Sequence, residues 1–124
     1  MILVDSDIVI DFLQGVEPSR TRLAGLLESN RAATTVLNSF EILSGARTAK
    51  RLAQVEALLA AMKVLEITPL AASRAAAVRR ALDRAGLSIA TPDALIAGVA
   101  LTARLPLWTR NRRHFEHVSE LELA

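Results

Sequence analysis

The chain opens with MILVDSDIVIDFL, residues 1–13, in which an acidic group separates two apolar runs. The first run, followed by Asp5, is typical of a short buried strand over residues 2–5 with the acid at its carboxyl end. From Ser6 the apolar residues predict a helix that stops at Gly15, a residue type favoured just beyond a helix end. A buried strand that leads directly into a helix is a building unit of α/β folds.

The rest of the chain repeats this alternation. Further helices are predicted to start at Pro18-Ser19, at Val36 and at Thr91-Pro92, and to cover residues 52–62 and 70–85. Further strands are predicted at residues 32–35, 63–67 and 107–108, the last of them central, with 121–123 as an added edge. Strands that alternate with helices favour a mainly parallel sheet covered on both faces, so we expect a three-layer α/β/α fold. The length suits a single domain over residues 1–124.

Composition excludes several kinds of site. Cysteine is absent, so disulfides, zinc–thiolate centres and cysteine nucleophiles are ruled out. Aromatic residues make up only 3%, which leaves little room for base stacking in nucleic-acid recognition. Asp5 interrupts the first apolar run, so no signal peptide is expected, and the longest apolar stretch, 94–103, is shorter than the roughly 20 residues of a membrane span. We therefore expect a soluble protein, and a reducing cytoplasm suits it.

The charge is mildly basic and rich in arginine. The formal net charge is +2, and 13 of the 15 basic residues are arginine. Arginine pairs bidentately with phosphate and carboxylate, which fits a nucleic acid or an acidic partner. A GC-rich genome that favours arginine codons would give the same composition, so both interpretations stay open.

Three acids are placed where such a sheet would bring them together: Asp5, Glu41 and Asp93. Asp5 ends the first strand, Glu41 lies just inside a helix after the second, and Asp93 follows Thr91 as the expected helix cap and Pro92 as the first helical residue. Converging carboxylates repel one another unless a cation neutralises them, and oxygen ligands suit Mg²⁺ or Mn²⁺. The pattern indicates metal-assisted phosphoryl chemistry.

Each acid also has a structural interpretation. Asp93, and more so Asp7, would serve as ordinary first-turn residues of helices. Glu41 would normally be a solvated helix residue, although apolar neighbours such as Phe40 make its segment look mostly buried. A charge at the end of a buried strand needs a partner, so Asp5 is the hardest of the three to explain structurally.

Four segments together resemble the PIN-domain ribonucleases, and more narrowly the VapC-type toxins of toxin–antitoxin systems. They are residues 1–13, 36–45, 92–97 and 107–115, which occur in the family's order and span essentially the whole chain. The resemblance implies a PIN-like fold, an Mg²⁺- or Mn²⁺-dependent endoribonuclease with Asp5, Glu41 and Asp93 as catalytic and metal-binding acids, a homodimer, and a cognate antitoxin protein as partner.

The chain departs from the family at the position of a fourth acid. The two candidate positions hold Asn111 and His114. Asn111 could position a metal-bound water or a phosphate through its amide, and His114 could bind metal or phosphate when protonated, although a surface loop residue is the favoured interpretation of His114. Fewer negative charges favour one tightly held metal over two. The remaining substrate-binding candidates are a hydroxyl near the site and a basic run beside it, which could also be a solvated charge run: Ser6, Arg110, Arg112 and Arg113.

Two other functions compete. The chain could be a catalytically degenerate PIN scaffold that binds RNA or a protein, because the fourth acid is missing. It could also be a haloacid-dehalogenase-like phosphatase, since Asp5-Ser6-Asp7 matches the Asp-x-Asp that follows the first strand in those enzymes. Lys63 is a poor candidate for the later lysine that this class requires.

Overall fold

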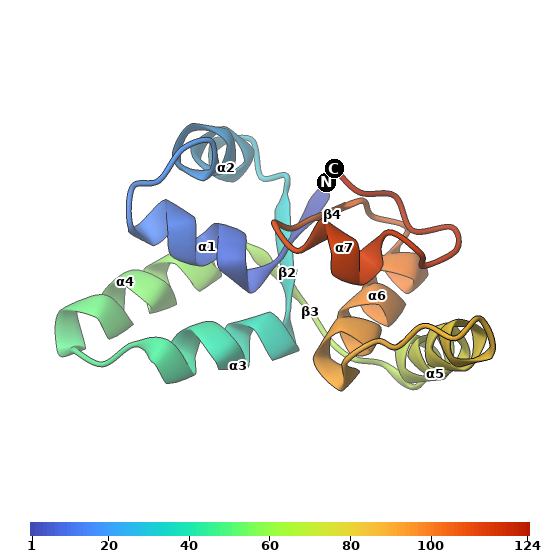
Figure 1. Ribbon diagram of the computed structural model, residues 1–124. Coiled ribbons are helices and arrows are strands. Elements are labelled where there is room, and N and C mark those ends of the chain that lie inside the picture. The colour runs from blue at the N-terminus through green and yellow to red at the C-terminus, as the bar shows by residue number, and fades with distance from the viewer.

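Four parallel strands form the centre of the computed structural model, which describes residues 1–124 (Figure 1). The strands are β1 (Ile2–Val4), β2 (Ala32–Thr35), β3 (Lys63–Leu65) and β4 (Leu107–Trp108). Their order in the sheet is β3-β2-β1-β4, so the chain leaves β1 on one side and returns on the other. The crevice between β1 and β4 is thus a topological switch point, where ligands bind in open α/β sheets.

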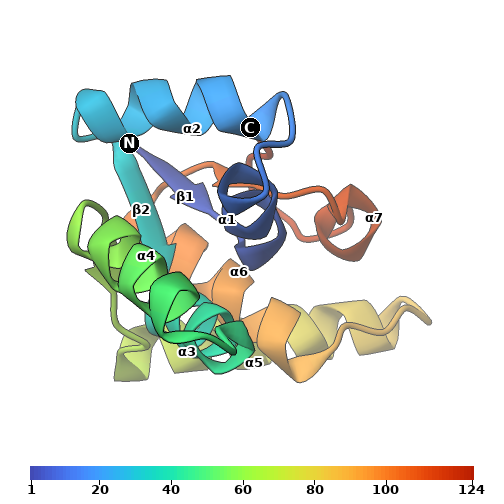
Figure 2. The same cartoon turned by 90° about the vertical axis from the view of Figure 1, so that its left-hand side faces the viewer.

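Seven helices surround the sheet. Figure 1 shows α1–α4 on one side of the strands and α5–α7 on the other, and the turned view in Figure 2 separates α2 from α5 at opposite ends of the molecule. Their bounds are α1 (Ser6–Leu13), α2 (Ser19–Glu28), α3 (Val36–Gly45), α4 (Ala49–Ala60), α5 (Pro69–Arg84), α6 (Thr91–Ala103) and α7 (Arg112–Phe115). The predicted three-layer α/β/α fold is confirmed.

The strands β1, β2 and β4 bury both of their faces, because successive side chains point to opposite sides, whereas β3 is largely exposed. Leu3 belongs to the core cluster that α5, α6 and α7 complete, whereas Val4 belongs to the cluster formed with α1–α4. The same alternation divides Leu107 from Trp108 in β4. Two apolar cores, one on each side of the sheet, therefore fix the strands in place.

The helices α5 and α6 approach each other unusually closely. A Cβ added at Gly98 in α6 would lie 2.3 Å from the carbonyl oxygen of Ala71 and 2.9 Å from the Cβ of Ala75. Only glycine fits this crossing, which brings two largely alanine faces together. None of the helices is long and apolar enough to cross a membrane.

Several sequence expectations differ from the structure. Thr91 is the first residue of α6 and not its cap; Ala90 holds that position without a side-chain bond, and the Thr91 hydroxyl accepts a hydrogen bond from Arg79 instead (2.8 Å). β3 is shorter than predicted, and residues 121–123 contribute one bridge, Leu107 to Leu123, instead of a strand. β4, predicted to be central, is therefore the outermost strand of the sheet, beside β1. α7 was not predicted, because four residues are too few to show helical periodicity.

The predicted burial around Glu41 is also wrong. Only Asn38 and Ile42 of α3 are buried, Glu41 is exposed, and 66% of Phe40 is accessible to solvent. The helix presents an apolar stripe outward as well as inward, which the sequence alone does not distinguish from a buried helix.

Candidate active site

Asp5 lies at the carboxyl end of β1, where its side chain is only 6% exposed. Its Oδ1 accepts hydrogen bonds from the backbone N–H of Ser6 (2.8 Å) and from Nδ2 of Asn38 (2.9 Å). Its Oδ2 accepts the hydroxyl proton of Thr109 (2.7 Å), which follows β4 on the other side of the crevice. Donors from three separate segments therefore orient this buried carboxylate.

Glu41 stands at the rim of the same site, one turn along α3 from Asn38. Its Oε1 accepts a hydrogen bond from the Ser6 hydroxyl (3.2 Å). Partial desolvation raises the pKa of Glu41, and the Ser6 bond opposes that rise. The neighbouring carboxyl groups raise this pKa further, so they lie close enough to interact with Glu41: Asp5, Asp93 and Asp7.

Asp7 joins the site instead of serving only as a helix-start residue. One of its oxygens, Oδ2, accepts the backbone N–H of Arg110 (2.9 Å), whereas the buried Oδ1 has no hydrogen-bond partner. Burial raises the pKa of Asp7, and the Asp5 carboxylate adds to the rise. An unpaired buried carboxylate oxygen is costly, and it is a free ligand atom beside Asp5.

Asp93 enters from the other side of the sheet, in the first turn of α6 as predicted. Its Oδ2 lies 3.0 Å from Nδ1 of His114, a residue of α7 whose side chain is 55% exposed. His114 is therefore a helix residue in contact with a site acid, and not an isolated loop residue. Figure 1 shows the beginnings of α1 and α3 facing α6 and α7 near the centre of the molecule.

The donor set fits a divalent cation in its chemistry. It offers carboxylate and hydroxyl oxygens and one imidazole, and the unpaired Oδ1 of Asp7 is available. The side chains do not form a ready cage, because no group of three or more Asp, Glu or His residues is arranged to hold one ion. This differs from the expectation of three acids that converge on one cation. Mg²⁺ commonly binds through one or two carboxylates and keeps several waters, so the looser arrangement still fits it.

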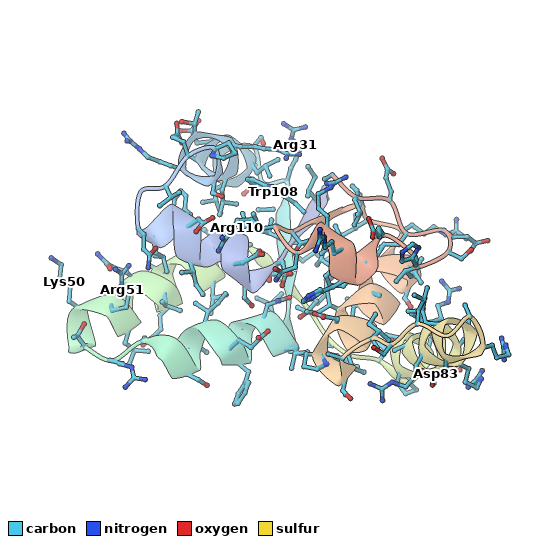
Figure 3. All side chains as sticks on the ribbon, in the orientation of Figure 1. Arg31, Lys50, Arg51, Asp83, Trp108 and Arg110 are labelled. Atoms are coloured by element: carbon cyan, nitrogen blue, oxygen red, sulfur yellow. The ribbon has the colours of Figure 1, made fainter.

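The basic run after β4 is partly engaged. Arg110 forms an ion pair with Asp11 of α1 (2.9 Å), and in Figure 3 it lies against that helix. Arg112 donates to the carbonyl oxygen of Ala124 (3.0 Å), and Arg113 is exposed. Asn111 directs its backbone N–H to the Thr109 hydroxyl (3.0 Å).

Two polar residues of the site were not identified from the sequence. Asn38 is fully buried, and its amide reaches both Asp5 and Ser6 (2.9 and 2.8 Å). Thr109 is 3% exposed and holds the other oxygen of Asp5. The strand-end rule that found Asp5 applies equally to Thr109, and Asn38 precedes Glu41 by three positions on the same helix face.

Ser6, expected to contact substrate, uses its hydroxyl within the site. The hydroxyl accepts from Asn38 and donates to Glu41, and the residue is 8% exposed. The geometry indicates that Ser6 orients Glu41.

The sheet topology argues against the phosphatase interpretation, because it places Lys63 away from Asp5. Lys63 is the first residue of β3, at the amino end of a strand parallel to β2. It therefore lies at the opposite edge of the sheet from Asp5.

A parallel sheet with interacting acids at its carboxyl edge defines this chain as an α/β/α domain with an acidic, cation-compatible site. The comparison with family models is specific: the PIN domain model matches residues 2–121. The chain belongs to the PIN-domain family.

Its relatives are nucleases by name. Ribonuclease VapC10 of Mycobacterium tuberculosis is 37% identical over 122 residues, which cover 98% of this chain and 91% of the relative. Ribonuclease VapC19 of the same organism is 31% identical over 123 residues, 98% of each chain.

Solved structures confirm the fold. The DNA-bound VapBC of Salmonella typhimurium matches with a TM-score of 0.86 at 24% identity and covers 100% of this chain and 98% of its counterpart. The DNA-bound VapBC2 of Rickettsia felis matches with a TM-score of 0.85 at 18% identity, over 100% of this chain and 98% of that one.

Proposed function

We propose that this chain is an Mg²⁺- or Mn²⁺-dependent endoribonuclease that hydrolyses RNA phosphodiester bonds and acts as the toxin of a type II toxin–antitoxin pair. The observation that carries the proposal is the buried Asp5 carboxylate at the end of β1, which Asn38 and Thr109 hold from two other segments and to which Glu41 is linked through Ser6. The near full-length similarity to VapC ribonucleases supports it. The proposal treats residues 1–124 as a single PIN domain.

The acids have different parts in this proposal. Asp5 and Asp93 would bind the metal directly, Glu41 would bind it directly or through water, and the unpaired oxygen of Asp7 would add negative charge. A bound divalent ion acidifies a water and neutralises charge that develops on the phosphate. Glu41, whose carboxylate accepts a hydrogen bond from Ser6, would orient a water for attack on the phosphate.

The basic run would hold the RNA backbone. Arg113 is exposed, and Arg110 would exchange its Asp11 partner for a phosphate. Asn111, whose backbone N–H bonds the Thr109 hydroxyl, and Arg112 follow β4 in the same basic segment. Contacts of this kind weaken as salt rises, because phosphate binding releases counterions.

The assembly is also part of the proposal. Antitoxin complexes of the VapBC type share this fold, so we propose a cognate antitoxin as protein partner and the cytoplasm, where RNA is available, as location. A homodimer would cover the outward stripe of α3, where Phe40 and Val36 are 66% and 38% exposed one turn apart. Light scattering on the parent and on Phe40→Ser tests this, because the polar variant should form a weaker dimer and be monomeric at concentrations where the parent is dimeric.

Incubation of the purified chain with total RNA, with and without Mg²⁺, tests the activity. New RNA ends should appear only with the metal, and sequencing of those ends identifies the cleavage site. Asp5→Ala and Asp93→Ala should abolish cleavage while the protein stays folded. Asp83→Ala, at an exposed acid of α5, is the matched control and should cut at the parental rate.

The same experiment separates the enzyme from a degenerate scaffold. A binding protein would shift RNA in a gel and leave it intact at every Mg²⁺ and Mn²⁺ concentration. Parental cleavage by either folded variant would show that the metal assignment is wrong.

A further inference from the structure

Asn38 is a buried amide that links two residues of the site to the start of α3. It lies at the third position of α3 and is fully buried. Its Nδ2 donates to Asp5 Oδ1 (2.9 Å) and to Ser6 Oγ (2.8 Å), and its Oδ1 accepts the Thr35 hydroxyl (2.7 Å). One amide therefore contacts the ends of β1 and β2 and the start of α1.

The orientation of the amide is determined by these neighbours. A carboxylate only accepts hydrogen bonds, so the atom that faces Asp5 must be the NH₂ nitrogen. Because Ser6 Oγ accepts from that nitrogen, its own proton is free to point to Glu41, where a 3.2 Å bond is found. The bonds run in one direction, from Thr35 through Asn38 and Ser6 to Glu41.

The backbone anchors this chain of bonds. Thr35 caps α3, and Asn38 completes the capping box: the Thr35 hydroxyl accepts the Asn38 N–H (3.1 Å) and the Asn38 side chain faces the Thr35 N–H (3.4 Å). The amide is thus fixed by the same contacts that start the helix. It cannot follow a rotation of Asp5 without breaking the cap.

We propose that Asn38 is a positioning residue of the site, which locks Asp5 and Ser6 in the orientation that divalent-metal binding and RNA cleavage require. The inference rests on the proposed function. It assigns Asn38 no contact with metal or RNA, and its effect passes through Asp5 and, by way of Ser6, Glu41. Loss of such a supporting hydrogen bond typically weakens metal affinity or activity about 10–100-fold.

Calorimetric titration with Mn²⁺ tests the proposal in the parent, Asn38→Leu and Asn38→Ala. Leucine keeps the branched shape and removes both hydrogen-bonding groups. We expect Mn²⁺ affinity to fall about 10–100-fold in both variants. In cleavage assays kcat should fall while KM for RNA stays near the parental value, because the phosphate contacts are untouched.

Thr34→Val is the matched control. Thr34 is as fully buried as Asn38, and its hydroxyl donates to the carbonyl oxygen of Val4 (2.8 Å) without touching a carboxylate. The variant should lose thermal stability and bind Mn²⁺ as the parent does. Affinity within twofold of the parent in both folded Asn38 variants would overturn the proposal.

Asp5→Ala separates this failure from failure of the proposed function. If the parent takes up no Mn²⁺, or if Asp5→Ala binds it equally well, the metal site itself is wrong. If Asp5→Ala loses binding and the Asn38 variants keep it, only the positioning role is wrong.

NMR of the parent makes the test independent of variant folding. Saturation with Mg²⁺ should shift the side-chain amide signals of Asn38 and leave those of the exposed Asn30 in place. Unmoved Asn38 signals, in a sample whose other resonances report Mg²⁺ binding, would contradict the proposal.

Discussion

The carboxyl edge of the sheet and the α5–α6 pair solve opposite problems. At the edge, Asp5, Asp7 and Glu41 hold negative charges close together, and one buried oxygen has no partner. Between α5 and α6, Gly98 and its alanine neighbours leave no space for a further side-chain carbon. The crowded carboxylates at the edge destabilise the folded state, whereas the close packing of α5 against α6 stabilises it.

This contrast separates the effects of substitutions. Changes at the helix crossing should alter folding and leave the site's chemistry intact, because a side chain added at Gly98 would meet only apolar and backbone atoms of α5. Changes at the edge should alter metal binding or cleavage, whether or not they also alter folding stability. Substitutions at both places test this separation.

Gly98→Val should have the largest effect on folding. Its side chain would overlap the Ala71 carbonyl and the Ala75 methyl group, and overpacking of this kind costs about 1–3 kcal/mol or more. Thermal unfolding should show a large fall in Tm. Gly25→Ala is the control: nothing lies within 4 Å of the added Cβ in α2, so it should stabilise by about 0.5–1 kcal/mol. An unchanged Tm in Gly98→Val would mean that the two helices are not so closely packed.

Thr109→Val should separate chemistry from packing at the edge. Valine has the same shape but cannot donate to Asp5 Oδ2 or accept from the Asn111 N–H. Mn²⁺ affinity should fall about 10–100-fold, as measured by calorimetry. Stability should fall by about 1–3 kcal/mol, the cost of an unpaired buried group. Thr102→Val, whose hydroxyl bonds the Gly98 carbonyl in α6 (2.8 Å), should leave Mn²⁺ affinity unchanged.

Asp7→Asn should raise the Tm of the metal-free protein at pH 7. The folded-state pKa of Asp7 is raised above its ordinary value of 3.8. The contribution of Asp7 to stability is therefore most favourable below pH 3.8 and is lost as pH rises through the raised pKa. The variant avoids this loss. Its advantage should vanish below pH 3.8, where Asp7 is protonated in both folded and unfolded parent. An advantage that persists at low pH would point to packing instead of charge.

His114→Ala should have the smallest effect on stability. The contact with Asp93 is between side chains that are 55% and 19% exposed, and exposed pairs contribute about 0.2–1 kcal/mol. Denaturant unfolding at pH 7 measures the difference. A loss of several kcal/mol would show that α7 is held in place by this contact, and not by the buried Phe115.

The sequence predicted the features that depend on local pattern. Strand–helix alternation gave the three layers, and the strand-end rule placed Asp5. It missed Asn38 and Thr109, because their importance depends on contacts with Asp5 across 33 and 104 residues of chain. It misplaced the start of α6, because Arg79 of α5 competes for the Thr91 hydroxyl. Phe40 is exposed because another face of α3 packs against the rest of the protein. The periodicity of the sequence does not determine which face of the helix is buried.

Thermal unfolding with increasing Mn²⁺ tests most directly whether the edge is strained until a cation enters. The Tm of the parent should rise with the logarithm of Mn²⁺ concentration. The free energy of unfolding should gain about 2.7 kcal/mol when the Mn²⁺ concentration is 100 times the dissociation constant. Gly98→Ala should start lower and rise in parallel, whereas Asp5→Ala should not respond. A parent whose Tm is indifferent to Mn²⁺, or an Asp5→Ala variant that rises with it, would contradict the account.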